Sequence, residues 1–237
     1  SDAAQKHPLD QSEYRRFVLD NGIKMLLVSD PDFNKSAAAV QVSVGSLADP
    51  PQRQGLAHFL EHMLFLGTEK YPEVADYLEY INQNGGGRNA YTDLDHTNYF
   101  FDINHDAFEG GIDRLAQFFI APLFTTEYTE RELKAVNSEH EKNLENDSWR
   151  KWQVQRTLYR EDHALNGFST GNLETLGDSD REELLAFHGQ HYSADRMSVV
   201  LLGKAPLDSL EAWGRTYFTP VANHQNPAPA YAADYQE

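Results

Sequence analysis

Apolar residues recur along the chain with two different spacings, and each spacing predicts a type of secondary structure. In the stretch 14–30, apolar and polar residues alternate on both sides of Asn21-Gly22. Alternation is typical of strands, and an Asn-Gly pair suits the positive φ angles of a tight hairpin turn. The same alternation predicts further strands at 37–46 and 196–203, and a pair of short strands within 85–103.

A spacing of three and four residues between apolar positions is typical of helices with one buried face. It predicts helices over residues 54–66, 74–84, 107–120, 127–146, 178–191 and 207–217. Residues 150–175 show no clear pattern. Because hairpins are interspersed with helices, without regular strand–helix–strand alternation, we expect an α+β fold. Its largely antiparallel mixed sheet would carry the helices on one face.

Composition narrows the classes of partner. Lys and Arg number 20 against 37 Asp and Glu, which gives a formal charge of −17 over 237 residues. A surface this acidic repels phosphate backbones, so we expect no nucleic-acid partner. The sequence contains no apolar run long enough to cross a bilayer, so no membrane association is expected. With no cysteine, any zinc site must use imidazole and carboxylate ligands, a set typical of catalytic zinc.

The predicted helix 54–66 contains the sequence His58-Phe59-Leu60-Glu61-His62. At 100° per residue, His62 lies about 40° from His58 around the helix, and Glu61 about 60° to the other side. The apolar residues occupy the opposite face: Leu56, Phe59, Leu60, Met63, Leu64 and Leu66. Two imidazoles four positions apart can bind one metal ion, and Glu61 is close enough to act on a water there. The alternative is a solvated helix face, so a third ligand has to be found.

Candidates for the third ligand lie in the acidic helix predicted over 127–146. Its inward apolar stripe contains Leu133, Val136 and Leu144. Glu132 and Glu139 border this stripe, whereas Glu141 points about 180° away toward solvent. Helical geometry therefore selects Glu132 or Glu139 and does not decide between them.

Four stretches resemble the pitrilysin/insulinase family of zinc metallopeptidases, the inverzincins with an HxxEH motif. They are "GLAHFLEHMLFLGTEKYP", "GGGRNAYTDLDHTNYFFDI", "RELKAVNSEHEKN" and "FSTGNLETLG". The third stretch places Glu139 77 positions after His62. The resemblance extends over roughly residues 17–220 and is closest to the insulin-degrading and pitrilysin branch.

The resemblance implies a role for each matched residue. His58, His62 and Glu139 would bind one Zn²⁺ per chain, and Glu61 would be the general base. Glu132 would be a carboxylate behind the ligands that orients one of them. The segment Asn89, Ala90 and Tyr91 would be an edge strand that pairs with the backbone of a peptide substrate.

The resemblance also implies a larger protein, because this branch usually has four homologous domains. Residues 1–220 would form the zinc-bearing peptidase domain, and the Pro- and Ala-rich residues 221–237 a linker or frayed tail toward a further domain. We expect a zinc metalloendopeptidase whose partners are peptide substrates and the remaining domains, with weak or no activity in isolation. The alternative is a non-catalytic scaffold of the same fold. A periplasmic location agrees with the resemblance, although cytoplasmic relatives exist.

Two further residue pairs have a structural interpretation. His188 and His191, three positions apart, have no candidate metal-binding neighbour and are predicted to be surface histidines. Trp149 and Trp152 are predicted to be packing residues.

Overall fold

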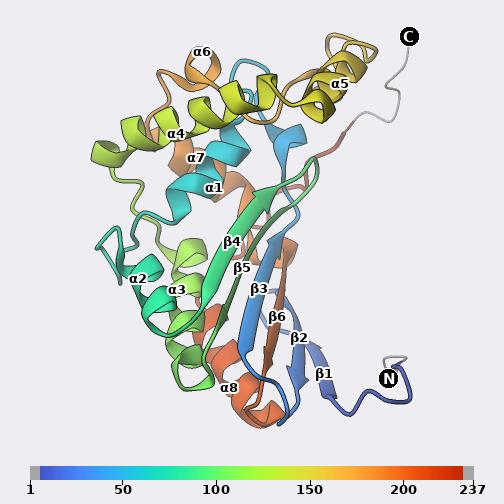
Figure 1. Cartoon of the computed structure of the whole chain (residues 1–237), viewed down its shortest axis with the longest axis vertical. Helices are drawn as coiled ribbons and strands as arrows, with labels where there is room; N and C mark the ends of the chain where they lie inside the picture. Colours follow the sequence, from blue (N-terminus) through green and yellow to red (C-terminus); the bar gives the residue numbers. More distant parts are fainter. Residues whose placement is uncertain (1–5, 232–237) are drawn as a thin grey trace.

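Six strands form one sheet in the computed structural model, which describes residues 6–231 (Figure 1). Their order across the sheet is β1-β2-β6-β3-β5-β4, so β4 and β1 are the edge strands. All neighbours are antiparallel except β2 and β6. The strands are β1 (Glu13–Val18), β2 (Lys24–Ser29), β3 (Ser36–Val42), β4 (Gly87–Thr92), β5 (Thr97–Ile103) and β6 (Met197–Gly203).

The β1–β2 hairpin forms at Asn21-Gly22 as predicted. Gly22 has a φ of +99°, a left-handed conformation that glycine adopts without steric cost. The Asn21 side chain donates hydrogen bonds to the carbonyl oxygens of Phe218 (2.9 Å) and Val221 (3.0 Å). The turn therefore also binds the C-terminal part of the chain to the first hairpin.

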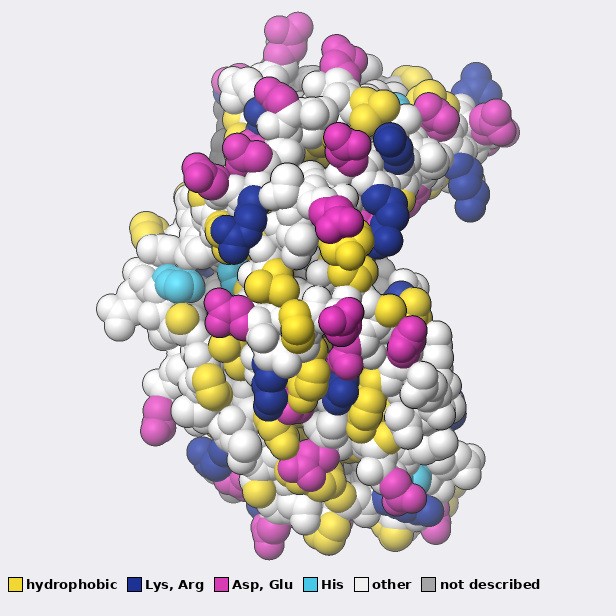
Figure 2. All heavy atoms as spheres, turned by 90° about the vertical axis from the view of Figure 1, so that its left-hand side faces the viewer, with side chains coloured by type: hydrophobic (Ala, Val, Ile, Leu, Met, Phe, Trp, Pro, Cys, Tyr) yellow, Lys and Arg dark blue, Asp and Glu magenta, His cyan; other side chains and the backbone are white. Residues whose placement is uncertain are grey.

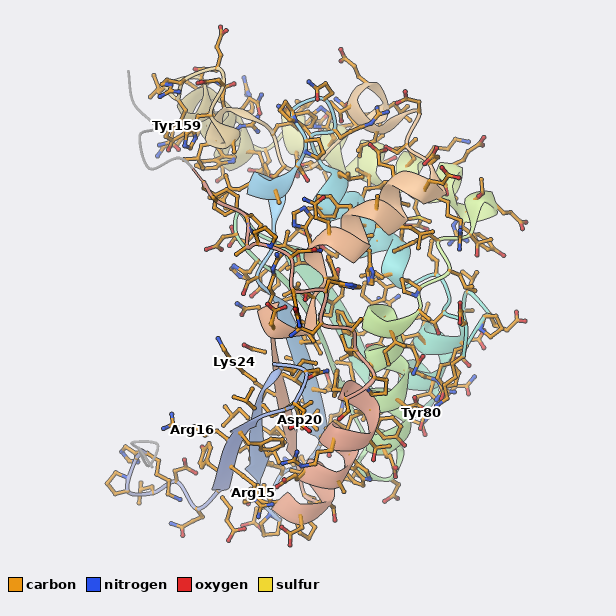
Figure 3. All side chains as sticks on the ribbon, turned by 180° about the vertical axis from the view of Figure 1, so that it is seen from behind. Arg15, Arg16, Asp20, Lys24, Tyr80 and Tyr159 are labelled. Atoms are coloured by element: carbon orange, nitrogen blue, oxygen red, sulfur yellow. The ribbon has the colours of Figure 1, made fainter. Side chains whose placement is uncertain are left out.

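Four of the helices pack against one face of the sheet and the others pack mainly on helices, which confirms the predicted α+β fold (Figure 1). Seen from behind, α8 crosses in front of the strands beside the β1–β2 hairpin, and Arg15 on β1 pairs with Asp208 and Glu211 of α8 (Figure 3). The helices are α1 (Leu56–Leu64), α2 (Asp76–Gln83), α3 (Phe108–Ile120), α4 (Thr126–Leu144), α5 (Asp147–Arg156), α6 (Leu173–Leu176), α7 (Arg181–His191) and α8 (Leu207–Phe218).

The hydrophobic core lies between the sheet and these helices. Val40 and Val42 of β3 are fully buried, as are Phe59, Leu60 and Met63 of α1. Burying each such side chain contributes roughly 1.5–3 kcal/mol. The apolar face of α1 is therefore fixed in the core, and its polar face has to point away from it.

The stretch 150–175, which had no clear pattern, contains most of α5 and most of α6, joined by loops. The described tail residues 221–231 form neither helix nor strand, although Val221 is buried and Arg196 donates to the carbonyl oxygens of Asn226 and Pro227. The domain boundary at residue 220 stays a prediction, and residues 232–237 of the predicted tail lie outside the described residues.

The prediction for His188 and His191 was wrong, because each side chain is only 7% exposed. His188 donates from Nε2 to the carbonyl oxygen of Phe118 at 3.1 Å, so α7 is hydrogen-bonded to α3 through a buried imidazole. Burial lowers the pKa of His188 to about 4. These two histidines are therefore buried in the helical part of the protein, where they stay neutral near pH 7.

The surface carries charges of both signs. Figure 2 shows the side of the molecule that lies on the left in Figure 1. Acidic and basic side chains are interspersed there with apolar ones. None of the helices within residues 6–231 has the length and apolar character needed to span a membrane.

Candidate active site

The N-terminus of α1, which precedes the polar face of this helix, is held by the side chain of Asp49. The Asp49 carboxylate accepts hydrogen bonds from the backbone N–H groups of Gly55 (2.7 Å) and Ala57 (2.8 Å). Both groups lack partners inside the helix, so this contact caps α1. Burial raises the pKa of Asp49 to about 7, against the lowering effect of the two hydrogen bonds. The start of α1 is thus fixed one turn before His58.

The ring of His58 is oriented by a loop whose backbone packs closely against the backbone at the start of α1. Gly55 has a φ of +93°, and a Cβ there would lie 2.2 Å from the Cα of Gly171. This approach brings the carbonyl oxygen of Thr170 to 2.8 Å from Nδ1 of His58. Because a carbonyl oxygen only accepts, Nδ1 carries the proton. The lone pair of the neutral ring is therefore on Nε2, which is free to bind a metal.

His62 is oriented in the same way by α4. Its Nδ1 lies 3.4 Å from Oε2 of Glu132, whose Oε1 accepts from the Arg131 guanidinium at 3.0 and 3.1 Å. Burial lowers the pKa of His62, but the Glu132 hydrogen bond and the charges of Glu61, Glu132 and Glu139 outweigh it, so the net pKa is raised. The hydrogen bond from His62 lowers the pKa of Glu132. A carboxylate acceptor again leaves Nε2 of His62 as the ligand atom.

Glu139 completes a three-residue cluster. Its Oε2 lies 3.6 Å from Nε2 of His58 and 3.8 Å from Nε2 of His62, and all three ligand atoms lie within 4.8 Å of one another. Within residues 6–231 this is the single group of three or more His, Cys, Asp or Glu side chains with a spacing suited to a metal ion. Glu132 lies behind His62, so the structure separates the two glutamates that helical geometry left open.

The cluster fits a zinc ion by donor chemistry and by size. Two neutral imidazoles and one carboxylate are the ligand set of one class of catalytic zinc site, which leaves a fourth position open. With bonds of about 2.1 Å, neighbouring ligands of a tetrahedral zinc are about 3.4 Å apart. The observed 3.6 and 3.8 Å are close to this spacing. Both Nδ1 atoms already have acceptors, which is the usual support for metal-binding histidines.

Glu61 lies beside the cluster and is only 7% exposed. The hydroxyl of Thr92, at the end of β4, donates to its Oε2 at 2.5 Å. Burial raises the pKa of Glu61, against the lowering effect of His58, Thr92 and His62. A raised pKa suits a group that takes up and returns a proton.

The predicted substrate segment lies on the edge strand β4. Among the described strands β4 pairs only with β5, so its other edge is free. Asn89 and Tyr91 are exposed, whereas Ala90 is half-buried and faces the helices together with Thr92. The strand therefore ends next to Glu61, and its other edge pairs with no described strand.

Several groups that build this site have no signal in the sequence. The Thr92 hydroxyl, the Thr170 carbonyl and the Gly55–Gly171 approach join segments far apart in the chain, and no local pattern predicts them. Trp149 is 38% exposed and, with Trp152, lines a groove that also includes Thr92. Their prediction as packing residues was wrong for Trp149.

Comparison with known sequences agrees with this geometry. The family described as Insulinase (Peptidase family M16) matches residues 24–162, and the Peptidase M16 inactive domain matches residues 178–237. The first match covers more than half of the chain, so the protein belongs to the insulinase family of peptidases. Both matches contribute to one sheet, because β6 lies between β2 and β3.

Individual relatives are similar over nearly the whole chain. Insulin-degrading enzyme-like 2 of Arabidopsis thaliana is 50% identical over 229 residues, which is 94% of this chain and 24% of that protein. Human insulin-degrading enzyme is 46% identical over 233 residues, 95% of this chain and 23% of that protein. The crystal structure of pitrilysin is 38% identical, with a TM-score of 0.96 over 100% of this chain and 26% of that one. The chain thus spans about a quarter of the length of these relatives.

Proposed function

We propose that the chain is the zinc-bearing catalytic part of a metalloendopeptidase that hydrolyses peptide bonds. One observation carries the proposal: three ligand atoms from α1 and α4 converge to within 4.8 Å, with the buried Glu61 carboxylate beside them. Membership of a peptidase family supports the reaction class. The donor set supports zinc.

In this proposal each side chain has one task. His58, His62 and Glu139 hold the ion, and when bound it supplies a Lewis acid that polarises the scissile carbonyl and acidifies a water. The carbonyl oxygen of Thr170 holds the ring of His58 and the Glu132 carboxylate holds the ring of His62. Fixed rings keep both Nε2 atoms directed at one point.

Glu61 moves the proton. Its carboxylate takes a proton from the attacking water while the water oxygen bonds to the carbonyl carbon. The carbon–nitrogen bond then breaks, and the same proton passes to the leaving nitrogen. The Thr92 hydrogen bond occupies one oxygen of Glu61, which leaves the other oxygen for this transfer.

The substrate backbone pairs with the free edge of β4 at Asn89, Ala90 and Tyr91. Main-chain hydrogen bonds supply affinity whatever the side chains, so this mode accepts many sequences. The end of the strand at Thr92 directs the bound peptide past Glu61. Because the chain spans about a quarter of its relatives' length, we propose that it works together with the remaining domains of a larger peptidase.

The test uses the peptidase that contains this chain, with Glu61→Gln as the variant. Glutamine keeps the size of the side chain and removes the base, so zinc content should stay at the wild-type level. Cleavage should fall roughly 100- to 10,000-fold, the usual contribution of a positioned base. Glu141→Gln on the exposed face of α4 is the matched control and should cleave normally. Full activity of Glu61→Gln would remove Glu61 from this role.

A further inference from the structure

A pocket of about 410 Å³ opens beside the metal-binding cluster, at the end of β4 away from Thr92. Glu61 and His62 form one end of it. The rest of its lining combines apolar side chains with two guanidinium groups and the Glu132 carboxylate. The members used below are Phe65, Leu78, Arg88 and Arg131. A peptide on the free edge of β4 places a side chain next to this pocket, because Asn89 and Ala90 also line it.

Arg88 lies on this wall without an anionic partner. Its guanidinium carbon lies 4.9 Å from the centre of the Phe65 ring. Its Nε is buried and has no hydrogen-bond partner within the part of the chain that the structure describes. An unpaired buried donor costs about 1–3 kcal/mol.

The missing partner is unusual in this protein. Acidic residues outnumber basic ones by 17, and seven other arginines form ion pairs with Asp or Glu: Arg15, Arg53, Arg114, Arg131, Arg150, Arg160 and Arg215. Among residues 6–231, Arg88 makes no such pair. Arg156, Arg181 and Arg196 also form no ion pair, but each donates to a main-chain carbonyl oxygen, whereas Arg88 has neither kind of partner within residues 6–231. Its guanidinium is thus left available, and it lies in a pocket next to the reacting groups.

Arg131 lines the same pocket, but its charge is paired with the Glu132 carboxylate, which lines the pocket too. Its Nε and one terminal nitrogen donate to Glu132, and Glu132 in turn supports His62. Arg131 is therefore committed to the cluster, whereas Arg88 is not. A carboxylate in the pocket would meet the planar fork of Arg88, whose two parallel N–H groups match a carboxylate.

We propose that this pocket receives an acidic side chain of the substrate and that Arg88 is the residue that selects it. The inference rests on the proposed peptidase function and adds a substrate preference to it. Phe65 and Leu78 provide the apolar walls along which the methylene groups of a glutamate lie. Arg88 acts in specificity and takes no part in the proton transfer.

The experiment uses pairs of fluorogenic peptides with the complete zinc-loaded peptidase. Within a pair, one position among the three on either side of the cleaved bond holds Glu in one peptide and Gln in the other. We expect one position at which Glu is preferred about tenfold in kcat/KM, a typical effect of one charged hydrogen bond. Arg88→Gln should remove this preference without slowing cleavage of the Gln peptide, and Arg88→Lys should keep part of it.

Arg15→Gln is the matched control, because Arg15 lies on β1, the opposite edge of the sheet (Figure 3). It should keep the full preference. No preference at any position, or an unchanged preference in Arg88→Gln, would overturn the inference and leave the peptidase proposal standing. An equal loss on Glu and Gln peptides would also overturn it, since it would mean that Arg88 only supports Phe65.

A binding measurement separates the two proposals. If the wild-type protein cleaves no peptide, the peptidase proposal fails. The role of Arg88 is then tested by measuring the affinity for the same labelled Glu and Gln peptides by fluorescence anisotropy. Tighter binding of the Glu peptide that Arg88→Gln abolishes would support the acidic pocket. Equal binding of both peptides by the wild type would overturn it.

Discussion

Replacing Gly55 by alanine tests whether a backbone approach far from the ligands controls the metal site. Gly55 has a φ of +93°, where an alanine costs about 1–2 kcal/mol. The new Cβ would lie 2.2 Å from the Cα of Gly171, 2.4 Å from its N and 2.9 Å from the carbonyl carbon of Thr170. All three are backbone atoms, so the loop has to move, and overpacking of this kind costs about 1–3 kcal/mol. We expect a total destabilisation of about 2–5 kcal/mol.

The same displacement should weaken metal binding. Moving Thr170 lengthens its 2.8 Å hydrogen bond to His58, and loss of such a support typically costs 10- to 100-fold in metal affinity. Urea unfolding measures the first effect, and titration of the metal-free protein with zinc against a competing chelator measures the second. Gly189→Ala in α7 is the control, because a Cβ there would meet no atom within 4 Å. It should be neutral or stabilising by up to about 1 kcal/mol.

Gly55→Ala with wild-type stability and wild-type zinc affinity would refute this reasoning. A loss of stability alone, with zinc affinity intact, would refute the link between the loop and His58.

Two further predictions concern buried hydrogen bonds. In the folded protein the pKa of His188 is lowered to about 4, against about 6.5 in the unfolded chain. The contribution of the neutral imidazole to the free energy of unfolding is therefore fully present above pH 6.5 and is lost as the pH falls toward 4. His188→Gln keeps a donor for the carbonyl oxygen of Phe118 but cannot take up a proton. Between pH 6.5 and 5, its free energy of unfolding should therefore fall by about 1.5 kcal/mol less than that of the wild type. The same fall in both proteins, measured by urea unfolding at each pH, would contradict this. Glu132→Gln should weaken zinc binding about 10- to 100-fold in a chelator competition, because an amide supports His62 less well than a carboxylate; unchanged affinity would show that Glu132 does not orient His62.

Local patterns predicted most of the fold. The Asn21-Gly22 turn, the apolar face of α1 and the buried residues Leu133 and Val136 of α4 each follow from residues within one element. The prediction of Leu144 in the same inward stripe was wrong, because it is 58% exposed near the end of α4. The predicted helices and strands match the structure to within a few residues, except in the stretch 150–175.

The site could be predicted only in part. Its ligands follow from the spacing of residues within single helices, whereas the groups that hold those ligands in place come from segments far away in the sequence. Helical spacing placed His58 and His62 on one face but left Glu132 and Glu139 equivalent. Only the packing of α4 against α1 shows which carboxylate meets both Nε2 atoms. Thr92 reaches Glu61 because the register of β4 on β5 brings that strand end to α1. His188 was assigned to the surface because no candidate metal-binding neighbour was found for it, whereas tertiary packing buries it.

Zinc content of the purified protein tests the central claim most directly. It is measured by mass spectrometry for the wild type, His62→Ala, Glu139→Gln and the control Glu141→Gln, after identical incubation with zinc and removal of free metal. We predict one zinc per chain in the wild type and the control, and a sharp reduction in the other two. Equal zinc in Glu139→Gln and Glu141→Gln, or none in the wild type, would contradict a metal site formed by α1 and α4.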